Sequence, residues 1–314
     1  MSKLAVIDFG SNTFHLLIVE VYGNNNNFHE LERKRIFTNI AEGGVQEISA
    51  DAIQRGIDAC LIFKDLIHSY NCDYVGIVGT EALRSAANSP KFVNQVELIL
   101  STEVEIIDGN READLIFKGV KLLHPMDDGS TYLIMDIGGG STEFIIVRNS
   151  KVLWAQSFKL GVAVMYAEWH HTEPISHDSL SGLQESIEIM LEPLFDEVSL
   201  HKPDTLIGAS GSFEVLESMT GKQVYYHQNN TINISEFERI SEIIINSSYE
   251  ERLTMKGLPK ERAKLIVVAM VLLQKIVYTI NPKNIIVTPY ALKEGVLSEM
   301  MDQKNKGHQF DGLN

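Results

Sequence analysis

One pattern occurs twice in this chain of 314 residues. In residues 4–19 and again in 132–147, an apolar strand ends in aspartate, a turn of small polar residues follows, and a second apolar strand begins. This order predicts a β-hairpin with a polar tip in each copy. The two aspartates, Asp8 and Asp136, lie 128 positions apart. That spacing is too long for a solenoid repeat and indicates a duplicated domain.

The segments after the two hairpins share one order, a third strand and then alternating helices and strands. After the first hairpin we predict strands at 31–40, 74–78 and 104–107, and helices at 50–70, up to about 100 and at 111–123. After the second we predict strands at 152–158, 205–207 and 285–287, and helices near 165 and at 177–198, 235–247, 261–280 and 291–301. The predicted fold class is α/β, with two mixed sheets covered by helices and an active-site cleft between them. The predicted domains are residues 1–124 and 125–314, with the last helix, about 291–302, packing back on the N-terminal domain.

Charge and composition exclude several classes of protein. A formal net charge of −15 argues against nonspecific binding to nucleic acid, which calls for an excess of Lys and Arg. No apolar run approaches the roughly 18 residues of a membrane span, and the apolar start at residues 4–7 is too short for a signal peptide. Cys60 and Cys72 show neither a pairing framework nor metal-ligand spacing. We therefore expect a cytoplasmic protein with reduced thiols, no membrane span and no nucleic-acid partner.

The two hairpin tips are candidate anion sites. Because glycine lacks a side chain, several backbone N–H groups of such a turn can point at one phosphate, while Ser and Thr hydroxyls add donors. A third glycine turn lies between a predicted strand and a helix that contains Phe213, and it has the same potential. The alternative is that all three are ordinary tight turns. The candidate residues are Gly10, Ser11, Asn12 and Thr13; Gly138, Gly139, Gly140, Ser141 and Thr142; and Gly208, Ser210 and Gly211.

Three acidic residues are candidate ligands of Mg²⁺. Asp8 and Asp136 each follow four apolar residues at the end of a predicted strand, and Glu143 follows the second tip. Mg²⁺ takes oxygen ligands and often binds through one or two carboxylates, substrate phosphates and water. A bound cation would also reduce the repulsion between a polyanionic ligand and an acidic chain. The alternative is that these acids cap turns.

Glu112 is the candidate general base. It follows the predicted turn at 108–110, at the start of a helix, where a carboxylate could deprotonate the water that attacks phosphorus. Such a role is typically worth about 10² to 10⁴ in rate, whereas the alternative is a glutamate that only complements the helix dipole. Arg84, with Thr80 in the turn before it, could bind phosphate through two N–H groups. Lesser basic candidates, expected to be solvated or ion-paired, are Arg111, Lys159, Lys264 and Lys293.

Six segments, taken in order, resemble the Ppx/GppA exopolyphosphatase and guanosine pentaphosphate phosphohydrolase family, and the resemblance covers nearly the whole chain. They are Val6–Asn12, Gly79–Arg84, Gly109–Ala113, Asp136–Glu143, Gly208–Gly211 and Leu292–Gly295. The resemblance implies two ribonuclease H-like domains of the actin-like ATPase superfamily. It implies Mg²⁺-assisted release of terminal phosphate from inorganic polyphosphate or guanosine pentaphosphate. It also makes a homodimer an expectation.

The resemblance assigns roles to single residues. It implies that Glu112 is the catalytic base and that Asp136 is linked to the metal. Around the phosphates it places Asp8, Ser11, Asn12, Arg84, Gly139, Gly140, Ser141, Thr142, Glu143 and Ser210.

Some features depart from the family pattern. Arg111 stands where many members have an acid, and it could add a phosphate contact. The other departures are Ser212, Tyr290 and Lys293. Long members carry extra C-terminal helical domains, whereas this chain is similar to the short form, so we expect lower processivity and shorter substrates.

Two other functions use the same motifs. A kinase or ATPase of the superfamily would hold ATP phosphates in both turns, but it needs an adenosine pocket and an acceptor site, which no sequence feature demands. A non-catalytic sensor of guanosine polyphosphates would signal by cleft closure. The acids Asp8, Glu112, Asp136 and Glu143 argue for turnover instead.

Overall fold

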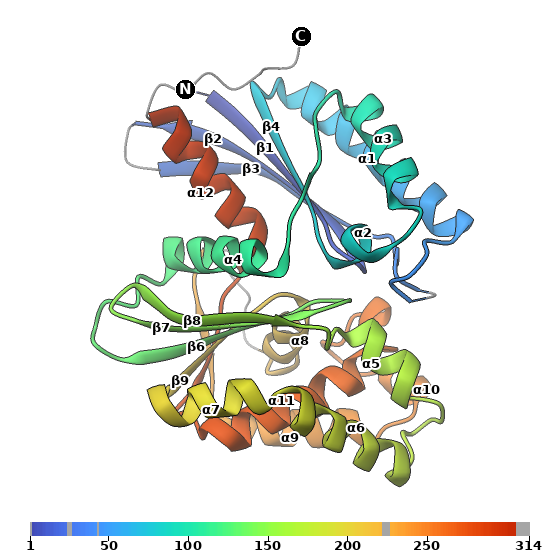
Figure 1. Cartoon of the computed structure of the whole chain (residues 1–314), viewed down its shortest axis with the longest axis vertical. Coiled ribbons are helices and arrows are strands. Elements are labelled where there is room, and N and C mark those ends of the chain that lie inside the picture. Colours follow the sequence, from blue (N-terminus) through green and yellow to red (C-terminus); the bar gives the residue numbers. More distant parts are fainter. Residues whose placement is uncertain (1, 24–26, 43, 222–226, 306–314) are drawn as a thin grey trace. The chain divides into compact units, whose positions relative to one another are not determined.

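The computed structural model describes residues 2–23, 27–42, 44–221 and 227–305. The chain packs as two compact units (Figure 1). Unit 1 combines residues 1–119 with 292–314, and unit 2 consists of residues 120–291. The predicted division into domains 1–124 and 125–314 stays a prediction.

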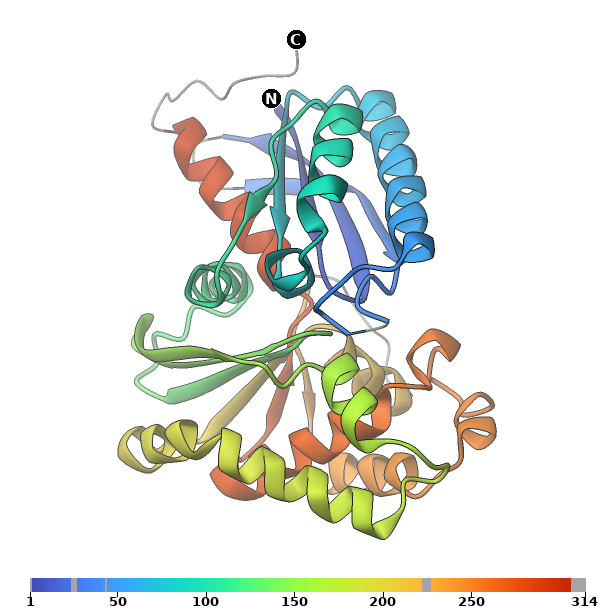
Figure 2. The same ribbon diagram turned by 45° about the vertical axis from the view of Figure 1, so that its right-hand side comes forward.

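Unit 1 is built on a five-stranded mixed sheet in the order β3-β2-β1-β4-β5. β1 pairs antiparallel with β2 and parallel with β4. The strands are β1 (Ser2–Phe9), β2 (Thr13–Tyr22), β3 (Asn27–Phe37), β4 (Tyr74–Gly79) and β5 (Glu105–Ile106). The helices are α1 (Ala50–Tyr70), α2 (Glu81–Ser85), α3 (Ser89–Leu100), α4 (Gly109–Leu123) and α12 (Leu292–Asn305). In both views α1 and α3 lie on one face of this sheet and α12 lies on the other (Figures 1 and 2).

Unit 2 is built on a six-stranded sheet in the order β10-β11-β9-β6-β7-β8. The strands are β6 (Thr131–Ile137), β7 (Thr142–Arg148), β8 (Lys151–Phe158), β9 (Thr205–Ala209), β10 (Asn230–Ile232) and β11 (Ile285–Val287). The helices are α5 (Val162–Trp169), α6 (His177–Met190), α7 (Glu192–His201), α8 (Gly211–Met219), α9 (Ile234–Ile245), α10 (Tyr249–Arg252) and α11 (Ile266–Ile280), with a 3₁₀ turn at Lys260–Arg262. β6 pairs antiparallel with β7 and parallel with β9, as β1 does with β2 and β4.

The shared order of strands confirms the predicted duplication and the α/β class. Local chemistry explains the limits of α1, which coincide with the predicted helix. The Ser49 hydroxyl accepts the N–H of Ala52 at its start, and Asn71 adopts the left-handed conformation at its end (φ 53°). The buried face includes Ala59, Phe63 and other residues of the unit 1 core.

Several predicted elements have different limits in the structure. The strand predicted at 31–40 runs from Asn27 to Phe37, and the single helix predicted up to about 100 is divided into α2 and α3. The single helix predicted at 177–198 is wrong, because α6 ends before Leu191 and α7 begins at Glu192, with proline in its first turn. The helix predicted from 261 begins at Ile266, after the 3₁₀ turn. The last helix, predicted at 291–301, continues as far as Asn305. The run of asparagines at 24–27 predicts a turn, and residues 24–26 lie outside the part of the chain that the structure describes.

Each unit has its own apolar core. The α11 helix is the centre of the core of unit 2, since ten of its residues are buried, from Ile266 to Val277. Within the described residues, no helix combines the length and hydrophobicity that a membrane span requires.

Candidate active site

The first glycine turn is held in place by hydrogen bonds that its backbone carbonyl groups accept. The N–H of Gly10 donates to the carbonyl of Thr13 at 3.2 Å, and a Cβ at Gly10 would lie 2.8 Å from that oxygen. The Ser11 carbonyl accepts from the N–H of Ala41, and the Asn12 carbonyl accepts from residues 38 and 39. The Ser11 hydroxyl accepts the N–H of Ala82 at 3.2 Å, which ties the turn to α2. The carbonyls of this turn therefore face the protein.

The second glycine turn repeats this arrangement. The N–H of Gly138 donates to the carbonyl of Ser141 at 2.9 Å. The carbonyls of Gly138 and Gly139 accept from the first two N–H groups of α5, at 3.0 and 2.9 Å. A Cβ at Gly161, just before α5, would collide with the backbone of Gly139, so only glycine lets the helix start so close to the turn. The Thr142 hydroxyl donates to the carbonyl of Leu160 at 2.7 Å.

The two turns leave equivalent backbone N–H groups available. Among the residues the structure describes, the N–H groups of Ser11, Asn12, Gly139 and Gly140 donate no hydrogen bond. A turn whose carbonyls are bonded inward and whose N–H groups are open can bind an anion. The prediction of two matching turns, each after an aspartate, agrees with this geometry.

Two buried carboxylates form a cross-strand pair in unit 2. Asp136 and Glu143 are direct partners in the β6–β7 ladder, so their side chains lie on the same face of the sheet. Asp136 is 6% exposed and Glu143 is 1% exposed. Asp136 accepts a hydrogen bond from the Ser210 hydroxyl, and Glu143 accepts one from Ser157 at 2.7 Å. Like charges in such a pair repel each other, and a cation beside them would relieve the repulsion.

The donor set of this pair suits magnesium. Carboxylate and hydroxyl oxygens are hard ligands, and Mg²⁺ commonly uses only one or two carboxylates. Over the described ranges there is no group of three or more His, Cys, Asp or Glu arranged to hold a metal ion.

The third glycine turn contacts the acid pair through Ser210. Ser210 has a positive φ of 71° and precedes the first residue of α8, so its hydroxyl reaches Asp136 on the neighbouring parallel strand. A Cβ at Gly208 would collide with the ring of Phe213, and one at Gly211 would collide with the guanidinium of Arg262. Arg262 is a basic residue at this turn that the sequence analysis did not single out, because 51 positions separate it from Gly211.

In unit 1, Glu112 lies beside Arg84. Glu112 is 6% exposed and occupies the first turn of α4, where its N–H donates to the carbonyl of Asp108 at 2.9 Å. The Arg84 guanidinium lies 3.5 Å from a carboxylate oxygen of Glu112, and it also bonds to Glu81 and to the carbonyl of Ile107. Burial alone would lower the pKa of Arg84, but the hydrogen bonds and charges of the two glutamates raise it. The Arg84 guanidinium therefore contacts both Glu81 and Glu112.

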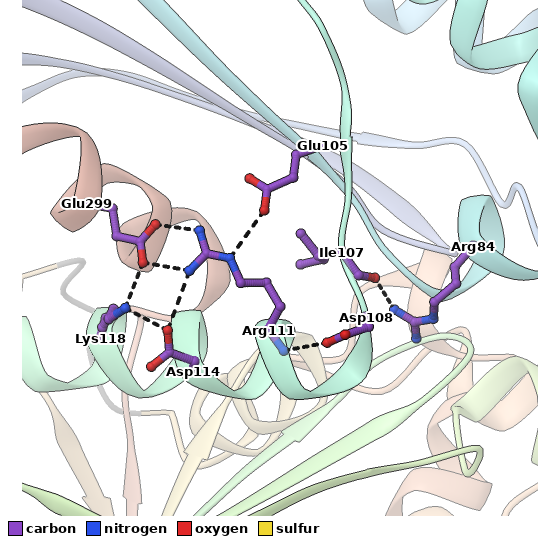
Figure 3. Close-up of polar contacts among 8 residues, drawn as sticks. All are labelled: Arg84, Glu105, Ile107, Asp108, Arg111, Asp114, Lys118 and Glu299. Carbon is purple, nitrogen blue, oxygen red and sulfur yellow. Dashed lines mark hydrogen bonds and ion pairs between the residues drawn. The ribbon is translucent and has the colours of Figure 1, made fainter. Parts of the chain in front are cut away.

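Of the lesser basic candidates, Arg111 and Lys293 contact acidic residues and Lys159 is exposed, as expected, whereas Lys264 lies over an aromatic ring. Arg111 donates to both carboxylate oxygens of Glu299 and to Glu105 (Figure 3). The Lys264 ammonium lies 5.0 Å from the centroid of the Tyr166 ring, and Lys293 lies 3.3 Å from its neighbour Glu294. Lys159 is exposed.

The predicted site residues thus form one group in each unit. In unit 1 the first turn is joined to Thr80, whose N–H and hydroxyl donate to the carbonyl of Phe9, and to the helix start at Ala82. In unit 2 the second turn, the acid pair and Ser210 lie together. The roles of these residues, and a joint site built from both groups, stay predictions.

Two units that repeat one sheet order, each with a glycine turn after an aspartate at the end of its first strand, define an α/β protein of the actin-like ATPase superfamily. Within that class the chain belongs to the Ppx/GppA phosphatase family, whose model matches residues 18–304.

Individual relatives agree with this assignment. The chain is 29% identical over 302 residues to the guanosine-5'-triphosphate,3'-diphosphate pyrophosphatase of Photobacterium profundum, which covers 95% of this chain and 59% of that protein. The chain therefore spans about three fifths of the length of that relative. The crystal structure of an exopolyphosphatase from Cytophaga hutchinsonii matches with a TM-score of 0.91 at 32% identity, over 96% of this chain and 98% of that one. The Aquifex aeolicus member of the Ppx/GppA family matches in fold, with a TM-score of 0.78 at 22% identity, over 98% of this chain and 99% of that one.

Proposed function

We propose that this protein is a phosphohydrolase that releases the terminal phosphate of inorganic polyphosphate or guanosine pentaphosphate by attack of water. The names of its relatives support this choice, since one is an exopolyphosphatase and another a guanosine-5'-triphosphate,3'-diphosphate pyrophosphatase. Membership of a phosphatase family supports hydrolysis over transfer to an acceptor.

One observation carries the proposal: the same glycine turn with open N–H groups is built twice. Each turn bonds its carbonyls inward, keeps N–H groups open and follows an aspartate at a strand end. Each turn, taken by itself, can bind one phosphate group of a ligand. The turns therefore support a phosphate-bearing ligand, and the names of the relatives support a phosphate chain.

Glu112 is the residue that we propose activates water. In the step, the water oxygen forms a bond to the terminal phosphorus, one water proton passes to a carboxylate oxygen of Glu112, and the bond to the bridging oxygen breaks. The products are orthophosphate and a chain shortened by one phosphate. Arg84 supports this role, because its contact with Glu112 fixes the direction of the carboxylate.

Asp136 and Glu143 are the residues that would hold Mg²⁺, with Asp8 as a further candidate ligand. The cross-strand carboxylate pair and its hydroxyl partners fit this ion. When bound, Mg²⁺ offsets negative charge on the phosphates and on the leaving oxygen. The open N–H groups of the second turn bind the phosphate oxygens, and Ser210 orients the carboxylate of Asp136.

Replacing Glu112 with glutamine tests the proposal. The full chain is assayed with Mg²⁺ for phosphate release from short and long polyphosphates, guanosine pentaphosphate and ATP. We expect E112Q to lose about 10² to 10⁴ in kcat, with substrate affinity changed by only a few fold. The exposed acid Glu103, which precedes β5, supplies the matched control E103Q.

The same panel separates the other candidate functions. Undiminished turnover by E112Q would remove the base assignment. Transfer of labelled phosphate from ATP to an acceptor by the wild type would indicate a kinase, and tight binding of guanosine polyphosphates without turnover would indicate a sensor.

A cytoplasmic location and a homodimer belong to this proposal as well. Both cysteines of the chain are free thiols, and burial raises the pKa of Cys60 to about 12 and that of Cys72 to about 11. Unreactive, unpaired thiols suit a reducing compartment. Light scattering of the purified chain tests the dimer, whose support is the family resemblance.

A further inference from the structure

The first turn of α4, which carries Glu112, is bound to a helix that lies far away in the sequence. Arg111 precedes Glu112 and donates to both carboxylate oxygens of Glu299 in α12, at 2.6 and 2.5 Å (Figure 3). A bidentate guanidinium–carboxylate pair restricts orientation as well as distance. The side chain of Arg111 is 33% exposed and that of Glu299 is 22% exposed, so water screens the pair only in part.

Two further side chains, Lys118 and Glu105, form hydrogen bonds with this pair. Lys118, two turns further along α4, donates to Glu299 at 2.7 Å and to Asp114 at 2.6 Å. Glu105 accepts from Arg111 at 3.2 Å, from the strand before α4. The hydrogen bond from Arg111, followed by the one from Lys118, lowers the pKa of Glu299 to about 2. Glu299 is therefore a carboxylate at any pH at which the protein would be assayed.

The two helices also touch at the backbone. A Cβ at Gly295 would collide with the carbonyl of Leu115, so glycine in α12 allows a contact with α4 that any other residue would prevent. A close backbone contact fixes the distance between two helices but leaves rotation about each axis less restricted. The bond between Arg111 and Glu299 supplies that second restriction, one turn before Leu115.

We infer that Glu299 is a positioning residue, which acts through Arg111 to fix the rotation of the first turn of α4 and so aims the carboxylate of Glu112. Successive helix residues point about 100° apart, so anchoring the Arg111 side chain to α12 sets the direction of its neighbour. Arg84 contacts the carboxylate of Glu112 itself, at 3.5 Å. The inference rests on the proposed function, because aiming a base matters only if Glu112 is one.

Two single variants and their combination test the inference. E299Q keeps the size of the side chain, R111Q shortens it, and each removes the charged bidentate pair. We expect each to lower kcat by about tenfold, with KM within twofold, because a small displacement of a catalytic group lowers the rate more than binding. The double variant should lose no more than either single variant, since both remove the same interaction. The matched control is D204N, which removes a carboxylate paired with Lys283 at 2.9 Å in unit 2.

Hydrogen–deuterium exchange supplies a readout that does not depend on activity. In E299Q, amides of residues 109–115 should exchange at least severalfold faster, while those of α1 keep the wild-type rate. If E112Q is inactive and both E299Q and R111Q keep kcat within twofold, the inference is overturned and the proposed function stands. Losses that multiply in the double variant also overturn it. If the wild type hydrolyses none of the substrates, the proposed function fails, and unchanged exchange in 109–115 then overturns the positioning as well.

Discussion

The carboxylate pair of unit 2 makes a prediction that separates metal binding from folding. Asp136 and Glu143 face each other across the β6–β7 ladder, and both are almost fully buried. The variant E143Q keeps the shape of the side chain and removes one of the two charges. We expect it to melt at a higher temperature than the wild type in EDTA and to lose the stabilisation that Mg²⁺ gives the wild type.

The magnitude follows from the pairing. Cross-strand partners have Cβ atoms about 5 Å apart. If the two carboxylates are taken as unit charges at about the same separation, they repel by about 3 kcal/mol at an effective dielectric constant of about 20. Glutamine still accepts from the Ser157 hydroxyl, but losing the charge weakens that bond by about 1 kcal/mol. The net gain is about 2 kcal/mol, which raises the melting temperature by about 5 °C for a unit of this size.

Thermal melts in EDTA and across a Mg²⁺ titration measure both effects. The control S157A removes the hydroxyl partner of Glu143 but leaves both charges, so it should melt slightly lower than the wild type in EDTA and still respond to Mg²⁺. An E143Q protein that is less stable than the wild type in EDTA, or that keeps the full Mg²⁺ response, would refute the reasoning.

Two further predictions concern Arg252 and His170, two buried residues of unit 2 that lie beside Glu173. Arg252 is 0% exposed and donates to Glu173 at 2.8 Å and to two backbone carbonyls, so R252A should cost about 3 kcal/mol in urea unfolding, whereas the exposed R239A should change little. His170 lies 3.4 Å from Glu173, and burial lowers its pKa. The folded protein therefore holds His170 neutral, and stability should fall as pH drops below about 6.5, by at most about 1.4 kcal/mol per pH unit. H170Q should show a smaller loss between pH 7.5 and pH 5.5, and an equal loss would contradict the assignment.

Most of the fold could be predicted because its strongest signals are local. The two hairpins are visible as apolar strands around glycine turns, and α1 is bounded by residues that cap helices, Ser49 and Asn71. The break at Leu191 could not be predicted, because the apolar periodicity continues across it and proline is tolerated in the first turn of a helix. The three-residue strand β10 is too short to show a pattern of its own.

Some residues of the candidate site could likewise be predicted from the sequence, and others could not. The turns and the acids are contiguous motifs, so the residues of each unit's group could be predicted from their spacing. Their partners could not, since Glu299 lies 188 positions from Arg111 and Arg262 contacts Gly211 only through tertiary packing. Arg84 was predicted to bind phosphate, and the structure shows what the sequence could not, that its guanidinium also contacts Glu112.

Unit 1 is built from two separate stretches of the chain, and this has a consequence for its biosynthesis. Residues 120–291 leave the ribosome between the two parts of unit 1, so unit 2 can fold while unit 1 still lacks α12. Until residues 292–305 are made, α4 has neither Glu299 nor the backbone contact at Gly295. Under the proposed function, the carboxylates of unit 2 could therefore be in place before the helix that bears Glu112 is held by α12, and hydrolysis would require residues 292–305 to have been translated.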